Sequence, residues 1–406
     1  MKLKETLKSF RLIFWANASF KSYLLKRDRA RLTHKYFSKS DEINYSYNVE
    51  EAITNFKNRH KLYNPNFSKK AHGDLQVFWV GLNKNQDESG LLQALRRISN
   101  VTVFKNENNK YGLLKQDSDA PNKKSIFKIR KSNAEFLLSQ VNDATKKGGV
   151  DVLIGQMLAR LIPKEVLIKI QAMGIPVINI SMDDRLPGLW LKGKNGFIEG
   201  SVGLAPGVDM MLTTSPETCL WFGIEKIPAI FWPLASDSSI FSSKVNTIKD
   251  IDVLFIGNKY GIREEIIKYL DSRGINVDCY GSGWPNGSVN TEQMASLTKR
   301  ARIILGVGTI GYCSDVYTLK LRDFDSLVSG ALYLTHRNPD LCELFKEGKE
   351  IEFYKSPKEA YEKLIFYLNN PNLINQIGLN GKMAALSNHT WDIRLEDTFK
   401  RLGLII

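Results

Sequence analysis

A cluster of polar and basic residues follows one of the most apolar segments of the chain. The run VLFIG ends at Gly257 and is followed by Asn258, Lys259 and, at the start of a helical pattern, Arg263. Backbone N–H groups and two cations at a strand-to-helix turn suit a phosphate group, because a helix N-terminus carries partial positive charge. The alternative is an ordinary strand-to-helix connection whose basic side chains face solvent.

A second group lies near the start of a helical pattern over residues 318–329, where Lys320, Arg322 and Asp325 occupy polar positions. Arg322 and Asp325 are three residues apart and therefore adjacent on the helix surface. They form either a surface ion pair or a ligand-binding pair. In the second case the carboxylate would accept two vicinal hydroxyls of a ribose, and the guanidinium would bind a diphosphate.

A glycine-rich segment, DCYGSGWPNG, spans residues 278–287 and contains Tyr280 and Gly281. It follows a predicted strand, but Trp284 and Pro285 interrupt the spacing of a dinucleotide-binding fingerprint, and no long apolar-faced helix follows at once. We therefore expect no nicotinamide or flavin cofactor. The glycines still allow a ligand to approach the backbone closely.

Two adjacent carboxylates, Asp183 and Asp184, follow the strand-like run IPVINIS. They could act as a catalytic base or hold a metal ion, although aspartates at strand ends more often bond to nearby backbone groups. No histidine in this half of the chain follows a predicted strand, so Asp183 and Asp184 are the candidate catalytic residues.

These residues are positioned by an alternation of β-rich and helical segments that begins after Asp74. Such alternation predicts an α/β protein with doubly wound parallel sheets, in which ligands bind beyond the carboxyl ends of the strands. The predicted strands are 76–81, 100–104, 150–155, 175–181, 251–257, 275–281, 302–308 and 331–335, and the helices between them are 90–98, 133–145, 163–173, 262–271, 291–299 and 318–329.

A polar stretch without apolar periodicity separates two rounds of this alternation, so we expect two domains in tandem. The predicted parts are a basic helical extension (1–72), an N-terminal Rossmann-like domain (73–242), a linker (243–250), a C-terminal Rossmann-like domain (251–386) and a terminal helix that returns to the N-terminal domain (387–406).

The positive charge is concentrated at one end of the chain. The formal net charge is +14, and residues 1–70 carry +10 of it, with 16 basic and 6 acidic side chains. Within residues 1–40 the basic residues alternate with aromatic and aliphatic ones, as in a helix that lies on anionic lipid. The alternative is a helix that packs on the N-terminal domain and exposes its lysines to solvent.

The four cysteines are far apart in the sequence and form no CxxC pair, so neither a zinc site nor a disulfide framework is expected. No apolar run approaches the length of a membrane-spanning helix, and the N-terminus lacks a signal-peptide core. We predict a cytoplasmic protein, peripheral at the inner face of the membrane.

The C-terminal segments IDVLFIG, CYGSGW and LKLRDFDSLVSGALYLT resemble the spore-maturation-protein-like (CgeB-like) glycosyltransferases over roughly residues 251–400. The resemblance implies the GT-B fold, two Rossmann-like doubly wound domains facing a cleft, with a C-terminal domain of the glycosyltransferase family 1/4 type. It also implies that the N-terminal domain (73–242) is the acceptor domain and the C-terminal domain (251–386) the sugar-nucleotide domain. The ribose-binding glutamate of the family falls at Asp325, and a second glutamate of related retaining enzymes falls at Tyr317. Both positions depart from the family pattern.

The resemblance implies transfer of a hexosyl or related sugar from a nucleoside-diphosphate sugar to a glycan or lipid-linked acceptor, in bacterial cell-surface polysaccharide synthesis. Together with the basic turns, it predicts that the donor is bound without a metal or other cofactor by the residues named above: Gly257, Asn258, Lys259, Arg263, Tyr280, Gly281, Lys320, Arg322 and Asp325.

A different class of protein remains open: a noncatalytic glycan- or nucleic-acid-binding protein on a glycosyltransferase-like scaffold. Clustered Lys and Arg with aromatic side chains can grip phosphates and stack on bases. Because the basic excess is confined to residues 1–70, we expect no nucleic-acid partner.

Overall fold

The computed structural model describes residues 2–116, 125–244, 247–310, 313 and 315–406, with side chains from residue 19 onward. The chain forms two compact units. We call Tyr36–Ile240 with Leu386–Ile406 the six-stranded unit, and Met1–Lys35 with Phe241–Ala385 the five-stranded unit. The predicted linker 243–250 includes residues 245–246, which lie outside the described residues.

The six-stranded unit is built on a parallel sheet with strand order β2-β1-β3-β4-β5-β6. Its central strands are buried along their length, as expected where both faces of a parallel sheet are covered. The strands are β1 Gln76–Val80, β2 Asn100–Val103, β3 Val152–Gly155, β4 Val177–Ser181, β5 Met210–Thr213 and β6 Ala229–Phe231; the helices are α2 Val49–Tyr63, α3 Lys84–Glu88, α4 Leu91–Ile98, α5 Ile126–Lys147, α6 Lys164–Gln171, α7 Pro216–Ile224 and α15 Trp391–Leu402.

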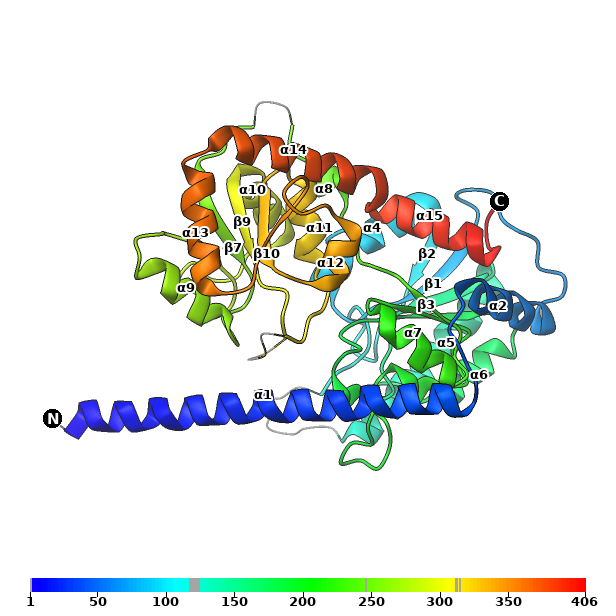
Figure 1. Ribbon diagram of the computed structural model, residues 1–406. Helices are drawn as coiled ribbons and strands as arrows, with labels where there is room; N and C mark the ends of the chain where they lie inside the picture. The colour runs from blue at the N-terminus through cyan, green and yellow to red at the C-terminus, as the bar shows by residue number, and fades with distance from the viewer. Residues whose placement is uncertain (1, 117–124, 245–246, 311–312, 314) are drawn as a thin grey trace. The chain divides into compact units, whose positions relative to one another are not determined.

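Helix α15, drawn red in Figure 1, packs against α4 and α2 of the six-stranded unit. Thr390 caps its N-terminus, and Gly403 ends it in the left-handed conformation that glycine adopts without strain. Trp232, which follows β6, donates its indole N–H to Thr398 at 2.8 Å. The last helix of the chain therefore completes a core formed mostly by residues more than 150 positions earlier.

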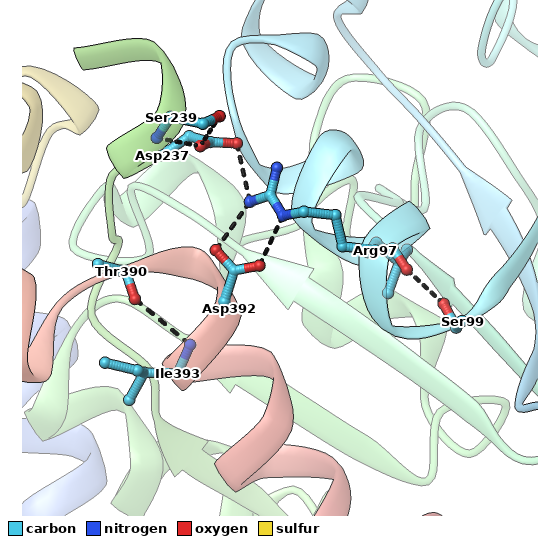
Figure 2. A network of polar contacts seen from close by, with 8 residues as sticks. Arg97, Ser99, Asp237, Ser239, Thr390, Asp392 and Ile393 are labelled. Atoms are coloured by element: carbon cyan, nitrogen blue, oxygen red, sulfur yellow. Dashed lines mark hydrogen bonds and ion pairs between the residues drawn. The ribbon is translucent and has the colours of Figure 1, made fainter. Parts of the chain in front are cut away.

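An arginine of α4 holds the start of α15 in place (Figure 2). Arg97 donates to both carboxylate oxygens of Asp392 at 2.7 Å and to Asp237 at 3.0 Å. The side chain of Asp237 is fully buried, and its other oxygen accepts bonds from the backbone and hydroxyl of Ser239. Bonding to these carboxylates raises the pKa of Arg97, so the guanidinium stays charged.

The five-stranded unit has the parallel order β11-β10-β9-β7-β8. The order reverses at β7, which lies between β8 and β9, so the switch point lies beyond the carboxyl ends of β7 and β9. Its strands are β7 Ile251–Ile256, β8 Asp278–Tyr280, β9 Ala301–Gly306, β10 Leu332–His336 and β11 Glu352–Tyr354, and its helices are α9 Arg263–Asp271, α10 Thr291–Arg300, α11 Leu321–Val328, α12 Pro339–Leu344 and α13 Pro357–Leu368.

Three helices contain a boundary between the units: α1 Lys2–Glu42, α8 Ser238–Phe241 and α14 Pro371–Asn388. Helix α1 covers the basic segment from which membrane binding was predicted. Among the described residues, no helix has both the length and the apolar character needed to cross a bilayer.

The helix predicted over residues 318–329 is shorter in the structure. Lys320 is extended, with φ −124° and ψ 150°, and α11 begins only at Leu321. The Asp323 carboxylate accepts the backbone N–H of Lys320 at 2.7 Å and so fixes the first turn at this point.

We expect Arg97→Ala to lower the free energy of unfolding by about 2 kcal/mol, because the buried Asp237 carboxylate loses its cation while Asp392 is partly exposed. Denaturant unfolding of the two proteins measures this. Arg96→Ala is the matched control: Arg96 is the preceding residue of α4, is exposed, and has no ion pair or hydrogen bond among the described residues. Equal losses in the two variants would contradict the role assigned to Arg97.

Candidate functional site

Two arginines from different helices meet at the end of β7. Arg322 of α11 donates to the carbonyls of Ile256 and, at 3.2 Å, Val307, while Arg263 of α9 donates to Asn258 O at 2.9 Å. A Cβ built on Gly257 would lie 2.5 Å from Arg322 Nη1 and 3.2 Å from Arg263 Nη1. Both guanidiniums therefore border Gly257, and only glycine leaves room for them.

The two cations are not neutralised by the protein. Among the described residues, neither Arg263 nor Arg322 forms an ion pair with a carboxylate. Burial, followed by repulsion from Arg322, lowers the pKa of Arg263 to about 10. An anion bound at this place would relieve the repulsion and replace the missing counter-charge.

The glycine-rich segment packs against the same turn. Trp284 donates its indole N–H to Gly257 O at 2.8 Å, and the backbone N–H of Ser282 donates to Asn258 Oδ1 at 3.2 Å. Gly281 has φ 133°, and a Cβ there would lie 2.4 Å from Gly257 O. No other residue fits at position 281 without displacing the turn.

Lys259 is held by its surroundings. Its ammonium lies 3.4 Å from a carboxylate oxygen of Glu264 and 5.2 Å from the centre of the Trp284 ring. Seven of the predicted donor residues thus lie together around the carboxyl ends of β7 and β8: Gly257, Asn258, Lys259, Arg263, Tyr280, Gly281 and Arg322. Lys320 and Asp325 belong to the same segment as Arg322, with Lys320 at the N-cap of α11 and Asp325 in its interior, 4% exposed.

Asp323 is a residue of this site that the sequence analysis passed over. It is fully buried, accepts the Tyr333 hydroxyl at 2.5 Å as well as Lys320 N, and sits beside Arg322. Burial raises its pKa, and the Tyr333 and backbone bonds oppose that rise. The sequence feature that could have identified Asp323 is its position three residues after the N-cap, where an acidic side chain can cap a helix. By anchoring α11, Asp323 positions Arg322.

Asp183 and Asp184 lie in the six-stranded unit, beyond the end of β4. Asp184 is 1% exposed and accepts hydroxyl bonds from Ser181 at 2.5 Å and Thr213 at 2.6 Å, while its carbonyl accepts the Trp190 indole N–H. It thereby ties the ends of β4 and β5 together. Asp183 is partly exposed and has φ 58°, in the left-handed region that aspartate adopts more readily than most residues. Of the two carboxylates, Asp183 is therefore the one that a second molecule can reach.

Histidine, cysteine and carboxylate side chains do not gather in groups of three or more suited to a metal ion anywhere in the described part of the chain. At Gly257 two cations converge without forming an ion pair with a carboxylate among the described residues.

Residues 263–400 match a family model described as glycosyl transferase-like. This glycosyltransferase-like region includes Arg263, Tyr280, Gly281, Lys320, Arg322 and Asp325. No curated protein sequence matches the chain.

Solved structures show the fold. A sucrose-phosphate synthase from Thermosynechococcus elongatus superposes with a TM-score of 0.55 and 11% identity, covering 80% of this chain and 99% of that one. HepE of Anabaena, solved with UDP and glucose, superposes with a TM-score of 0.54 and 9% identity, covering 80% of this chain and 100% of that one. A glycosyltransferase from Rickettsia africae superposes with a TM-score of 0.53 and 9% identity, covering 81% of this chain and 98% of that one. The predicted fold class, two parallel-sheet Rossmann-like domains as in GT-B glycosyltransferases, is confirmed.

The environment of Asp184 makes stability depend on pH. Burial raises its pKa from 3.8 to about 7, against the opposing bonds from Ser181 and Thr213. As pH rises from about 4 to about 7, the unfolded chain loses this proton before the folded one, so Asp184 progressively destabilises the fold. We expect Asp184→Asn to gain stability relative to the wild type over this range, by up to about 4 kcal/mol, and no further above pH 7. Urea unfolding at pH 5, 6, 7 and 8 measures the difference, and a difference that does not change with pH would contradict the prediction.

Proposed function

We propose that the protein is a glycosyltransferase of the spore-maturation-protein-like type that transfers a hexosyl or related sugar from a nucleoside-diphosphate sugar. The observation that carries the proposal is the pair of arginines at Gly257, which are close together, largely enclosed and without a carboxylate partner among the described residues. They occupy the switch point of a parallel sheet, where this fold binds ligands, and both belong to the glycosyltransferase-like region.

The paired guanidiniums suit the chemistry of a nucleoside-diphosphate leaving group. Cleavage of the bond between sugar and phosphate leaves negative charge on the diphosphate, and fixed donors aimed at that charge lower the barrier. Arg263 and Arg322 supply such donors, and the N-terminus of α9 adds partial positive charge. We propose that these groups act without a metal ion.

The remaining predicted residues have complementary roles in this proposal. Asp325 accepts the ribose hydroxyls, and Lys259 and the glycine-rich segment border the diphosphate. Asp183, the more exposed of the two carboxylates, deprotonates the acceptor hydroxyl, while Asp184 supports the strand ends. The acceptor is a glycan or lipid-linked saccharide of a bacterial cell-surface polysaccharide.

The donor site predicts a specific pattern of nucleotide binding. We expect the protein to bind one of four nucleotides, UDP, GDP, ADP or dTDP, with the same affinity in the presence and absence of EDTA. Calorimetry measures this affinity. Arg263→Gln and Arg322→Gln should each weaken that binding by about 10- to 100-fold, because each removes a charged hydrogen-bond donor. Arg263→Gln should also leave the melting temperature without nucleotide nearly unchanged, since it relieves repulsion from Arg322.

Arg273→Ala is the control, because this exposed arginine lies just beyond α9 and stacks on Tyr269 with 3.6 Å between guanidinium and ring centre. Wild-type protein that is folded but binds none of the four diphosphates would refute the proposed donor site. Binding that is lost in EDTA and restored by Mn²⁺ would refute metal independence.

We further propose that the basic helix α1 holds the enzyme at the cytoplasmic face of an anionic membrane, through residues 1–40. The expected result is co-flotation with vesicles containing one-third phosphatidylglycerol, weak or absent flotation with pure phosphatidylcholine, and release by 0.5 M NaCl, because screening weakens charge attraction. Replacing Lys21, Lys26, Arg29 and Arg31 with glutamine should abolish flotation, while the same number of changes at Lys346, Lys349, Lys355 and Lys358 should not. Equal recovery with both lipid mixtures would contradict the proposal.

A further inference from the structure

Near the carboxyl ends of β9 and β10, three polar atoms are buried without a hydrogen-bond partner among the described residues. They are Thr309 Oγ1, His336 Nδ1 and Asn338 Nδ2, and the exposures of the three residues are 2%, 4% and 0%. Buried polar groups in native proteins are nearly always paired, because an unpaired one has lost its bonds to water and gained nothing in return. We call these three residues the unpaired cluster.

The members of the unpaired cluster are neighbours within the five-stranded unit. A Cβ built on Gly308, which precedes Thr309, would lie 3.8 Å from Asn338 Nδ2. Thr309 pairs with Tyr317 in an isolated bridge, and the Tyr317 ring centre lies 5.8 Å from that of His336. The cluster also adjoins the arginine site, since Arg322 donates to Val307 O, two residues before Thr309.

The local bonds determine what Asn338 offers to a ligand. Its Oδ1 accepts the backbone N–H of Asp340 at 3.0 Å and caps α12, so the amide orientation follows from that bond. The NH₂ group is consequently left as a donor. Thr309 adds a hydroxyl, which can donate or accept.

His336 supplies an acceptor. Its ring stacks on Tyr354, with 5.4 Å between centres and 25° between planes. Burial lowers its pKa, and a hydrogen bond to the backbone of Lys355 opposes that shift. Among the described residues Nδ1 has no partner, so in the neutral ring with its proton on Nε2 this nitrogen is available as an acceptor.

We propose that the unpaired cluster binds ring hydroxyls of the transferred sugar, and that this sugar is a neutral pyranose. The inference rests on the proposed function, because it places the sugar beside the arginines that bind the diphosphate. Vicinal hydroxyls both donate and accept hydrogen bonds, and the cluster offers a donor at Asn338 Nδ2, an acceptor at His336 Nδ1 and a hydroxyl at Thr309. The cluster contains no cation, so a sugar acid or a sugar phosphate would lack a counter-charge there.

Two nearly isosteric variants test the proposal. Thr309→Val removes a hydroxyl that has no partner in the free protein, so the variant should melt at or above the wild-type temperature. Asn338→Asp keeps the oxygen that caps α12 and removes the NH₂ donor. Dissociation constants are measured for UDP, GDP, ADP and dTDP and for UDP-glucose, GDP-mannose, ADP-glucose and dTDP-glucose. For the preferred nucleotide, each variant should weaken binding of the sugar form about tenfold and leave binding of the bare diphosphate unchanged.

Thr298→Val is the matched control in the same unit. Thr298 is equally buried, but its hydroxyl bonds to Ala295 O at 3.1 Å, so this variant should lose stability and keep the wild-type ratio of the two dissociation constants. No diphosphate binding by the wild type would refute the proposed function itself. Two results would overturn the inference while leaving the proposed function intact. In the first, the wild type binds a diphosphate, but Thr309→Val and Asn338→Asp leave the ratio of the two dissociation constants unchanged. In the second, the wild type binds a diphosphate but none of the four nucleotide hexoses.

Discussion

The guanidiniums of Arg263 and Arg322 come together around Gly257 with no carboxylate to offset them among the described residues. Like charges held this close repel each other, and their partial burial strengthens that repulsion because less water screens it. The protein accommodates the pair through neutral partners: the carbonyls of Ile256, Val307 and Asn258. Two cations without a counter-charge favour an anionic ligand, and this is the reason for proposing a diphosphate at this place.

Much of the five-stranded unit can be understood as support for that pair. Asp323 caps α11 and receives the Tyr333 hydroxyl, which fixes the helix that carries Arg322. Gly281 permits the β8 turn to pass against Gly257 O, and Trp284 closes the same turn with its indole N–H. Changing any of these supports would move a guanidinium without touching the ligand. The unpaired cluster continues the site along the adjoining strand end, with neutral groups where the arginine site has charges.

The six-stranded unit uses buried carboxylates differently. Asp237 is satisfied by Arg97 and Ser239 and secures the terminal helix α15, so its charge is compensated. Asp184 has only hydroxyl partners at its carboxylate, and burial raises its pKa to about 7. Two aspartates with the same degree of burial therefore differ in their partners: Asp237 bonds to a cation, and the Asp184 carboxylate bonds to hydroxyl groups.

The sequence by itself determined the fold class and most of the strand ends at which functional residues sit, because alternating apolar runs and helical periods encode parallel α/β units locally. It also singled out the basic turn after VLFIG and the residues Lys320, Arg322 and Asp325. Only the tertiary structure decided that Arg263 and Arg322, 59 residues apart, share one site, that Asp184 is buried while its neighbour Asp183 is partly exposed, and that Asp323 anchors α11. It alone revealed the unpaired atoms of Thr309, His336 and Asn338. The physical reason is that burial and partner choice depend on distances between strand ends, and local sequence periodicity carries no information about those distances.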